Sequence, residues 1–164
     1  MPSINAVTIL VNPAITPEQL FSFYERNNIC EVGHGQEIAS RVLTHSSVIV
    51  GAFEGETIVG LARALCDGVA AAIMEFSMAL EYQGASLRHR NGSLIERDAL
   101  GVGQRIGTVL LEELGRMGAT FITVYLVEGC EEAFYESLGF QLNTGHLVYS
   151  IDKRPYVLEK QQGT

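Results

Sequence analysis

Three apolar segments in the middle of the chain are separated by two very short turns, and this spacing limits the fold more than any other feature. The segments span residues 47–54, 57–65 and 69–80, with Gly55-Glu56 and Asp67-Gly68 between them. Two-residue turns that contain glycine join adjacent antiparallel strands. The sequence therefore predicts a three-stranded antiparallel meander in the middle of the chain.

Helical patterns flank this meander on both sides. Thr16-Pro17-Glu18-Gln19 combines a capping residue, a proline for the first turn and a capping-box glutamine, and predicts a helix from there to about Asn28. The other expected elements are helices at 34–44, 103–117 and 131–138, and strands at 9–11, 121–127, 140–142 and 146–151. The nearly continuous apolar run 121–127 predicts a buried strand parallel to a neighbour, and the last two strands predict a hairpin. The pattern is of α/β (α+β) class, with a mixed, mostly antiparallel sheet and helices on both faces.

Composition limits the size, compartment and partners of the protein. With 164 residues, 47% of them apolar and 18% charged, the chain is expected to form one domain over 1–164. The net charge of −8 disfavours nucleic acid and anionic membranes as partners. We expect a cytoplasmic protein, because neither a signal peptide nor an apolar run near ~20 residues is found. The spacing of the three cysteines and four histidines predicts no disulfide framework and no metal site.

The stretch Gly101–Gly107 opens the strongest helical pattern. A helix N-terminus presents unpaired N–H groups and partial positive charge, glycines allow close approach, and Arg105 adds a cation. These properties suit a pyrophosphate. The alternative is a glycine turn that only connects the chain to a helix. The dinucleotide fingerprint and the Walker lysine are absent, so a nucleotide-binding α/β protein ranks last among the functions considered.

The order of elements and two motifs resemble the GNAT acyltransferases over roughly residues 45–150. "GVGQRIGTVLLEEL" is similar to the family's coenzyme A pyrophosphate motif, and "AFYESLGF" is similar to its second signature. "GAFEGETIVGLAR" resembles the central hairpin, and "MEFSMALEYQG" the fourth strand. In the first motif, Val102 stands where the family has Gln or Arg, Arg105 stands at its first glycine, and Gly107 matches its last position. About 15 extra residues precede the motif, and they predict an inserted mobile loop at about 85–100.

The resemblance implies an enzyme that moves an acetyl group from acetyl-CoA, or another acyl group from a related acyl-CoA, directly to a primary amine. Tyr135 would protonate the leaving thiolate, and Glu75 would act as the base through a water molecule. The Met78 N–H would polarise the thioester carbonyl. The cofactor-binding positions expected from the resemblance are Met78, Ala79, Leu80, Val102, Gly103, Gln104, Arg105, Ile106, Gly107, Thr108 and Phe134.

Each of these assignments has an alternative. Tyr135 would otherwise be a packing aromatic, and Glu75 would lie on the solvent face of an alternating strand. Cys130 at a strand-to-helix junction lacks a histidine partner for nucleophilic catalysis. The acidic balance favours a small cationic acceptor such as an amino sugar or polyamine. The rival function is a non-catalytic acyl-CoA-binding or partner-binding module, and the family resemblance suggests a homodimer.

Overall fold

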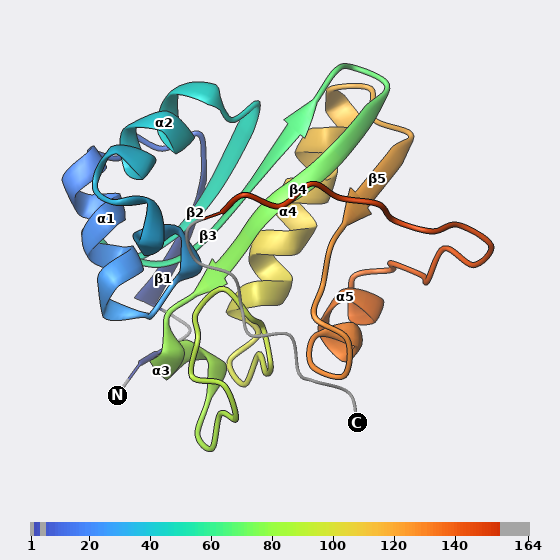
Figure 1. The fold of residues 1–164 in the computed structure, drawn as a ribbon. Coiled ribbons are helices and arrows are strands. Elements are labelled where there is room, and N and C mark those ends of the chain that lie inside the picture. Colours follow the sequence, from blue (N-terminus) through green and yellow to red (C-terminus); the bar gives the residue numbers. More distant parts are fainter. Residues whose placement is uncertain (1, 4–5, 155–164) are drawn as a thin grey trace.

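A five-stranded sheet runs through the molecule with its strands in chain order (Figure 1). The computed structural model describes residues 2–3 and 6–154, so residues 1, 4–5 and 155–164 of the predicted domain lie outside it. The strands are β1 (Val7–Val11), β2 (Val48–Glu54), β3 (Thr57–Cys66), β4 (Ala70–Met78) and β5 (Phe121–Val124). The first four pair antiparallel and β5 pairs parallel to β4. The predicted meander and the mixed, mostly antiparallel sheet are confirmed.

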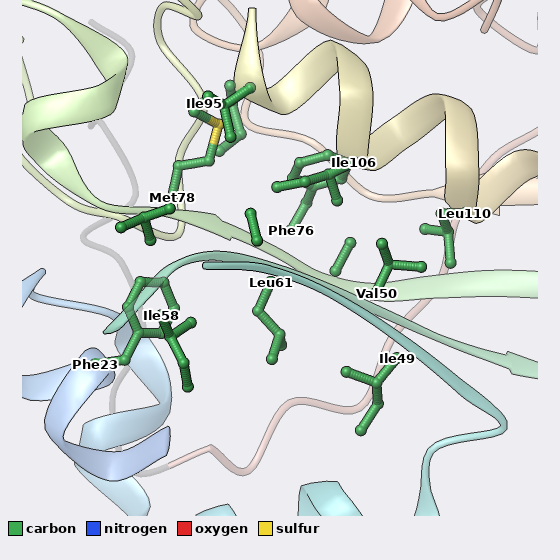
Figure 2. Close-up of a cluster of buried hydrophobic side chains, with 14 of the residues drawn as sticks. Phe23, Ile49, Val50, Ile58, Leu61, Phe76, Met78, Ile95, Ile106 and Leu110 are labelled. Carbon is green, nitrogen blue, oxygen red and sulfur yellow. The ribbon is translucent and has the colours of Figure 1, made fainter. Parts of the chain in front are cut away.

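Helices cover both faces of the sheet, as the sequence predicts. The helical elements are α1 (Pro17–Arg26), the 3-10 helix η2 (Cys30–His34), α2 (Glu37–His45), α3 (Leu80–Gln83), α4 (Val102–Arg116) and α5 (Glu132–Ser137). The α1 capping box forms, since the Gln19 N–H donates to Thr16 Oγ1 at 3.1 Å and the Thr16 N–H to Gln19 Oε1 at 2.9 Å. Figures 1 and 2 place α1 and α4 on opposite faces of the sheet.

The buried side chains form one layer on each side of the sheet. Ile106 and Leu110 from α4 lie over one face, and Phe23 from α1 packs below the other with Ile58 and Leu61 (Figure 2). All of these side chains are at most 3% exposed. The apolar stripe predicted for residues 103–117 is therefore the surface by which α4 is attached to the sheet.

The end of the chain differs from the prediction. The strand expected at 121–127 ends at Val124 and alternates between exposed and half-buried residues, because β4 is the only described strand that pairs with it. The predicted hairpin at 140–142 and 146–151 is wrong, since the described residues from 139 to 154 form no strand. An isolated hairpin is marginally stable in water, and this segment makes no ladder with β5. Leu142 and Ile151 are instead 88% and 90% exposed.

The turn after α4 depends on a glycine. Gly118 has φ +97°, and a Cβ on it would lie 2.5 Å from the carbonyl oxygen of Gly68. We expect Gly118→Ala to lower the free energy of unfolding by at least about 2 kcal/mol, since left-handed strain adds to a backbone clash. Gly115 is the control, because a Cβ there meets nothing within 4 Å. Gly115→Ala should raise stability by about 0.5–1 kcal/mol. Urea unfolding measures both, and equal effects would contradict the prediction.

Candidate active site

A cavity of about 410 Å³ lies where β4 and β5 separate. The two strands pair only as far as Ile73 and Val124. Beyond these residues β4 continues to Met78, whereas the segment after β5 leads to α5. The separation leaves space that side chains from η2, β4, α5 and the described C-terminal segment surround. The charged residues that line it are Glu31, Glu75, Glu131 and Arg154.

Glu75 of β4 is a buried anion held by three donors. Its Oε1 accepts from the Tyr24 hydroxyl and from Arg63 Nε, each at 2.8 Å, and its Oε2 accepts from the Ser77 hydroxyl at 2.9 Å. A bulge lies beside it, since the pairing with β3 shifts between Arg63 and Ala64. The glutamate side chain is only 1% exposed, so the alternative position on a solvent face is wrong. A base role for Glu75 stays a prediction, and both of its carboxylate oxygens already accept hydrogen bonds within the protein.

Tyr24 remains a hydrogen-bond donor to Glu75. Burial, followed by the negative charge of Glu75, raises the pKa of the Tyr24 hydroxyl well above its ordinary value. The phenol therefore keeps its proton across the accessible pH range. This network ties α1 to β3 and β4 beside the cavity.

Tyr135 of α5 lines the same cavity as Glu75. Its ring is 3% exposed and packs edge-on with Phe76, Phe134 and Phe140, at centroid distances of 6.2, 5.1 and 5.8 Å. Burial, and then the nearby Glu131, raise the pKa of Tyr135 well above its ordinary value. The phenol is thus a hydrogen-bond donor of low acidity, and it also has the packing role that the sequence offered as the alternative.

The N-terminus of α4 carries an internal carboxylate. The N–H groups of Gly103 and Gln104 donate to the two oxygens of Asp98, at 2.9 and 2.8 Å. Arg105 Nη2 donates to the carbonyl oxygen of Val7 in β1 at 2.9 Å. An anion of this chain therefore occupies the position expected for a phosphate. Asp98 was not predicted from the sequence, because it stands three residues before the N-cap Gly101 and outside the usual capping position.

The glycines of α4 permit close packing. A Cβ on Gly103 would lie 2.8 Å from Met78 Sδ and 2.9 Å from Phe134 Cε2, and one on Gly107 would lie 2.6 Å from the Leu138 side chain. Most of the other α4 residues predicted to bind the cofactor are also buried or hydrogen-bonded within the protein. Val102 and Ile106 are fully buried, Gln104 Nε2 donates to the Ser137 hydroxyl, and the Thr108 hydroxyl donates to the Gln104 carbonyl.

The predicted backbone donors at the end of β4 also have partners within the chain. The Met78 N–H donates to the Gly92 carbonyl at 2.9 Å, and the Ala79 N–H to the Val59 carbonyl at 2.9 Å. The Leu80 N–H donates to Asn27 Oδ1 at 3.1 Å. An acyl-CoA that used these donors would have to replace those partners.

The inserted segment, residues 85–100, supplies several of these contacts. Ile95 is fully buried beside Met78 (Figure 2), and its N–H donates to Glu131 Oε1 at 2.9 Å. The Ser93 hydroxyl accepts from the Cys30 N–H at 2.9 Å, at the start of η2. The segment thus connects η2, the end of β4 and the turn before α5. The mobility predicted for it stays a prediction.

One group of metal-type ligands lies beside the inserted segment. Ligand atoms of His89, Glu96 and Cys130 lie within 4.8 Å of one another. Both Glu96 oxygens already accept backbone N–H groups, and burial raises the pKa of the Cys130 thiol to about 11. The inserted segment supplies His89 and Glu96, and the turn before α5 supplies Cys130. The set shows no metal-type spacing in the sequence, because Cys130 lies far along the chain from the other two residues.

Solved structures share this architecture. Comparison with protein-family models finds no match, and comparison with curated proteins finds none. A protein from Deinococcus radiodurans R1 with an acetyltransferase designation is 22% identical, with a TM-score of 0.64 over 96% of this chain and 98% of its own. The GNAT family acetyltransferase SP0256 from Streptococcus pneumoniae TIGR4 is also 22% identical, with a TM-score of 0.61 over 90% of this chain and 98% of its own. The chain has the GNAT fold.

A further GNAT-fold neighbour was solved with a ligand. AAC(6')-Iy, in complex with the bisubstrate analog CoA-S-monomethyl-acetylneamine, is 10% identical, with a TM-score of 0.60 over 89% of this chain and 98% of its own. At these identities the likeness concerns the fold. Among residues 2–3 and 6–154, no helix has the length and apolar character that crossing a bilayer requires.

Proposed function

We propose that this GNAT-fold protein is an N-acetyltransferase that moves the acetyl group of acetyl-CoA directly to a primary amine of a small cationic acceptor. The observation that carries the proposal is the cavity at the separation of β4 and β5, which Glu75 and Tyr135 both line. Two residues predicted from distant motifs thus meet at one opening in the sheet. The surplus of carboxylates among the charged residues lining it supports a cationic acceptor.

In the proposed reaction, the amine nitrogen attacks the thioester carbon. A C–N bond forms, the C–S bond breaks, and the thiolate of coenzyme A leaves. The nitrogen gives up protons to a base in the cavity, and the sulfur receives one. Tyr135 is proposed to pass a proton to the sulfur through its hydroxyl, which stays protonated, and to recover one from the acylated nitrogen.

On the donor side, acyl-CoA would compete with the chain itself. The N–H groups proposed for the pyrophosphate are bound by Asp98, and the N–H proposed for the thioester is bound by Gly92. Binding would therefore displace part of the inserted segment. The mobility predicted from the length of this segment is consistent with such a displacement.

The experiment that tests the function measures free coenzyme A when acetyl-CoA is mixed with a panel of amines. Mass spectrometry of the acceptor should show addition of one acetyl group. The occupied Met78 N–H, which would otherwise polarise the thioester carbonyl, favours the second candidate, a non-catalytic acyl-CoA-binding module. Tight acetyl-CoA binding without release of coenzyme A from any amine would support that module and contradict the enzyme.

Replacing Asp98 should lower the stability of the protein while it raises the affinity for acetyl-CoA. We expect Asp98→Ala to lower the free energy of unfolding by about 1 kcal/mol, because two N–H groups in the first turn of α4 lose the carboxylate that accepts from them. The same change should lower the KM for acetyl-CoA about tenfold, since the freed N–H groups of Gly103 and Gln104 can donate to the pyrophosphate. Glu112→Ala removes an exposed carboxylate from the same helix and is the control. Urea unfolding and initial rates measure the two effects. An unchanged or higher KM would argue against a phosphate at this position.

A further inference from the structure

Glu31 of η2 has a carboxylate oxygen without a hydrogen-bond partner. Its side chain is 17% exposed and lines the cavity, and its Oε1 lies 3.7 Å from Arg63 Nη2. Its Oε2 is buried and accepts no hydrogen bond from any described residue. A buried polar oxygen without a partner is costly, and in a native structure such a group calls for a ligand, an ion or an ordered water.

The other two carboxylates of the cavity are already supplied with donors. Glu75 receives three side-chain hydrogen bonds, as described above. Glu131 receives the Ile95 N–H on Oε1 at 2.9 Å and the Val127 N–H on Oε2 at 3.0 Å. Among the described residues, Glu31 is thus the only carboxylate lining the cavity with a buried oxygen that accepts no hydrogen bond.

The charged and titratable groups around Glu31 favour a cationic ligand. Tyr24 from α1, Arg63 from β3, Glu75 from β4, Arg154 from the C-terminal segment and the adjacent Cys30 all face this region. Arg63 is shared with Glu75, to which it is closer, and Arg154 binds Asp152. Glu131, the N-cap of α5, and Tyr135 of α5 complete the cavity and add no positive charge. A positively charged ligand would therefore reduce an excess of negative charge.

The pKa of the Glu31 carboxyl suits a group that takes a proton from an amine. Burial, followed by the charge of Glu75, raises the pKa of Glu31 to about 8, while Arg63 and Arg154 oppose this shift. An approaching ammonium favours the carboxylate form and lowers that pKa again. A base whose pKa lies near the working pH exchanges protons in both directions at little cost.

We propose that Glu31 binds the ammonium group of the acceptor amine and takes its proton before the acyl transfer. This inference rests on the proposed function, and it places the acceptor against η2 and not against Glu75. The ammonium R–NH₃⁺ and the Glu31 carboxylate become R–NH₂ and a carboxylic acid. The nitrogen lone pair then attacks the thioester carbon, and the C–S bond breaks. The second proton leaves the nitrogen as the thiolate is protonated, and Glu31 returns its own proton to solvent.

The site should select primary amines that are charged in solution. The hydroxyl proton of a neutral alcohol is too weakly acidic for Glu31 to remove, and an anionic acceptor is repelled by the carboxylates. In this role Glu75 is a positioning residue, because its ion pair with Arg63 holds the guanidinium 3.7 Å from Glu31.

The first experiment compares pH profiles of kcat/KM for Glu31→Gln and the native protein, with cadaverine as the amine. In the native protein kcat/KM should rise with pH through about 8, because the base must lose its proton. Glu31→Gln should lose this rise and about 10²-fold in kcat/KM. Glu37→Gln changes an exposed glutamate on the neighbouring α2 and should leave the profile as it is. A Glu31→Gln protein with the native profile and rate would overturn the proposal.

A second experiment does not depend on turnover. Carbon-13 NMR of glutamate-labelled protein follows the titration of Glu31, which is assigned by the resonance missing from Glu31→Gln. Cadaverine should move this titration by more than one pH unit downward, and 1,5-pentanediol should not. An unmoved titration would overturn the inference even in an active enzyme. A moved titration with no release of coenzyme A would support the amine site and contradict the proposed function.

Discussion

Replacing Arg63 by methionine is expected to destabilise the protein by about 3–5 kcal/mol. The change leaves the Glu75 carboxylate, whose side chain is 1% exposed, without its cation. The hydroxyls of Tyr24 and Ser77 still donate to it, but they do not neutralise its charge. Glu31 also loses its nearest positive group, so two acids then face each other beside the cavity. Urea unfolding at neutral pH measures the effect.

Arg41→Met is the matched control, because Arg41 is exposed on α2 and should tolerate the change within about 0.5 kcal/mol. The double variant Arg63→Met with Glu75→Gln should recover part of the loss, since the buried charge of Glu75 is removed together with its partner. Equal stability of Arg63→Met and Arg41→Met would show that the ion pair does not stabilise the fold.

Tyr135→Phe is expected to lower kcat for acetyl transfer by about 10²-fold or more, with little change in stability. The phenylalanine keeps the edge-on contacts with Phe76, Phe134 and Phe140 and loses only the hydroxyl proposed to act at the leaving sulfur. Because the pKa of Tyr135 is raised, its hydroxyl is protonated at every ordinary pH. The loss should therefore be the same from about pH 6 to 10.

Tyr149→Phe provides the comparison, since Tyr149 is 88% exposed in the described C-terminal segment. Its turnover should match that of the native protein. Unchanged turnover in Tyr135→Phe across the pH range would assign Tyr135 to packing alone, and the protonation of sulfur would then need another donor.

The regular part of the fold was predictable because its signals are local. The turns at 55–56 and 67–68 fix the meander, and the capping box at Thr16 fixes the start of α1. The C-terminal hairpin was not predictable in the same way. The sequence contains a turn signal there. Strands at this position also need the edge of an existing sheet to pair with, and a local sequence pattern does not show whether such an edge is present.

The candidate site was predictable in part. Family-like motifs pointed to Glu75 and Tyr135, which do line one cavity. The roles of Glu31 and Asp98 depend on contacts between distant segments: Glu31 meets Arg63 and Glu75, and Asp98 meets the start of α4. A single glutamate in a 3-10 turn and a single aspartate in a polar loop carry no spacing that distinguishes them from solvent-facing acids.

The sheet order has a consequence for how the molecule folds. Strands β2, β3 and β4 are neighbours in both sequence and space, and only short loops need to close to form them. Strands β1 and β5 join through long connections, one containing η2 and the other the inserted segment and α4. Contacts distant in sequence form slowly because loop closure precedes their gain. We therefore expect the meander to form first during folding. The cavity residues of η2 and those around α5 should pack against it later, from opposite ends of the chain.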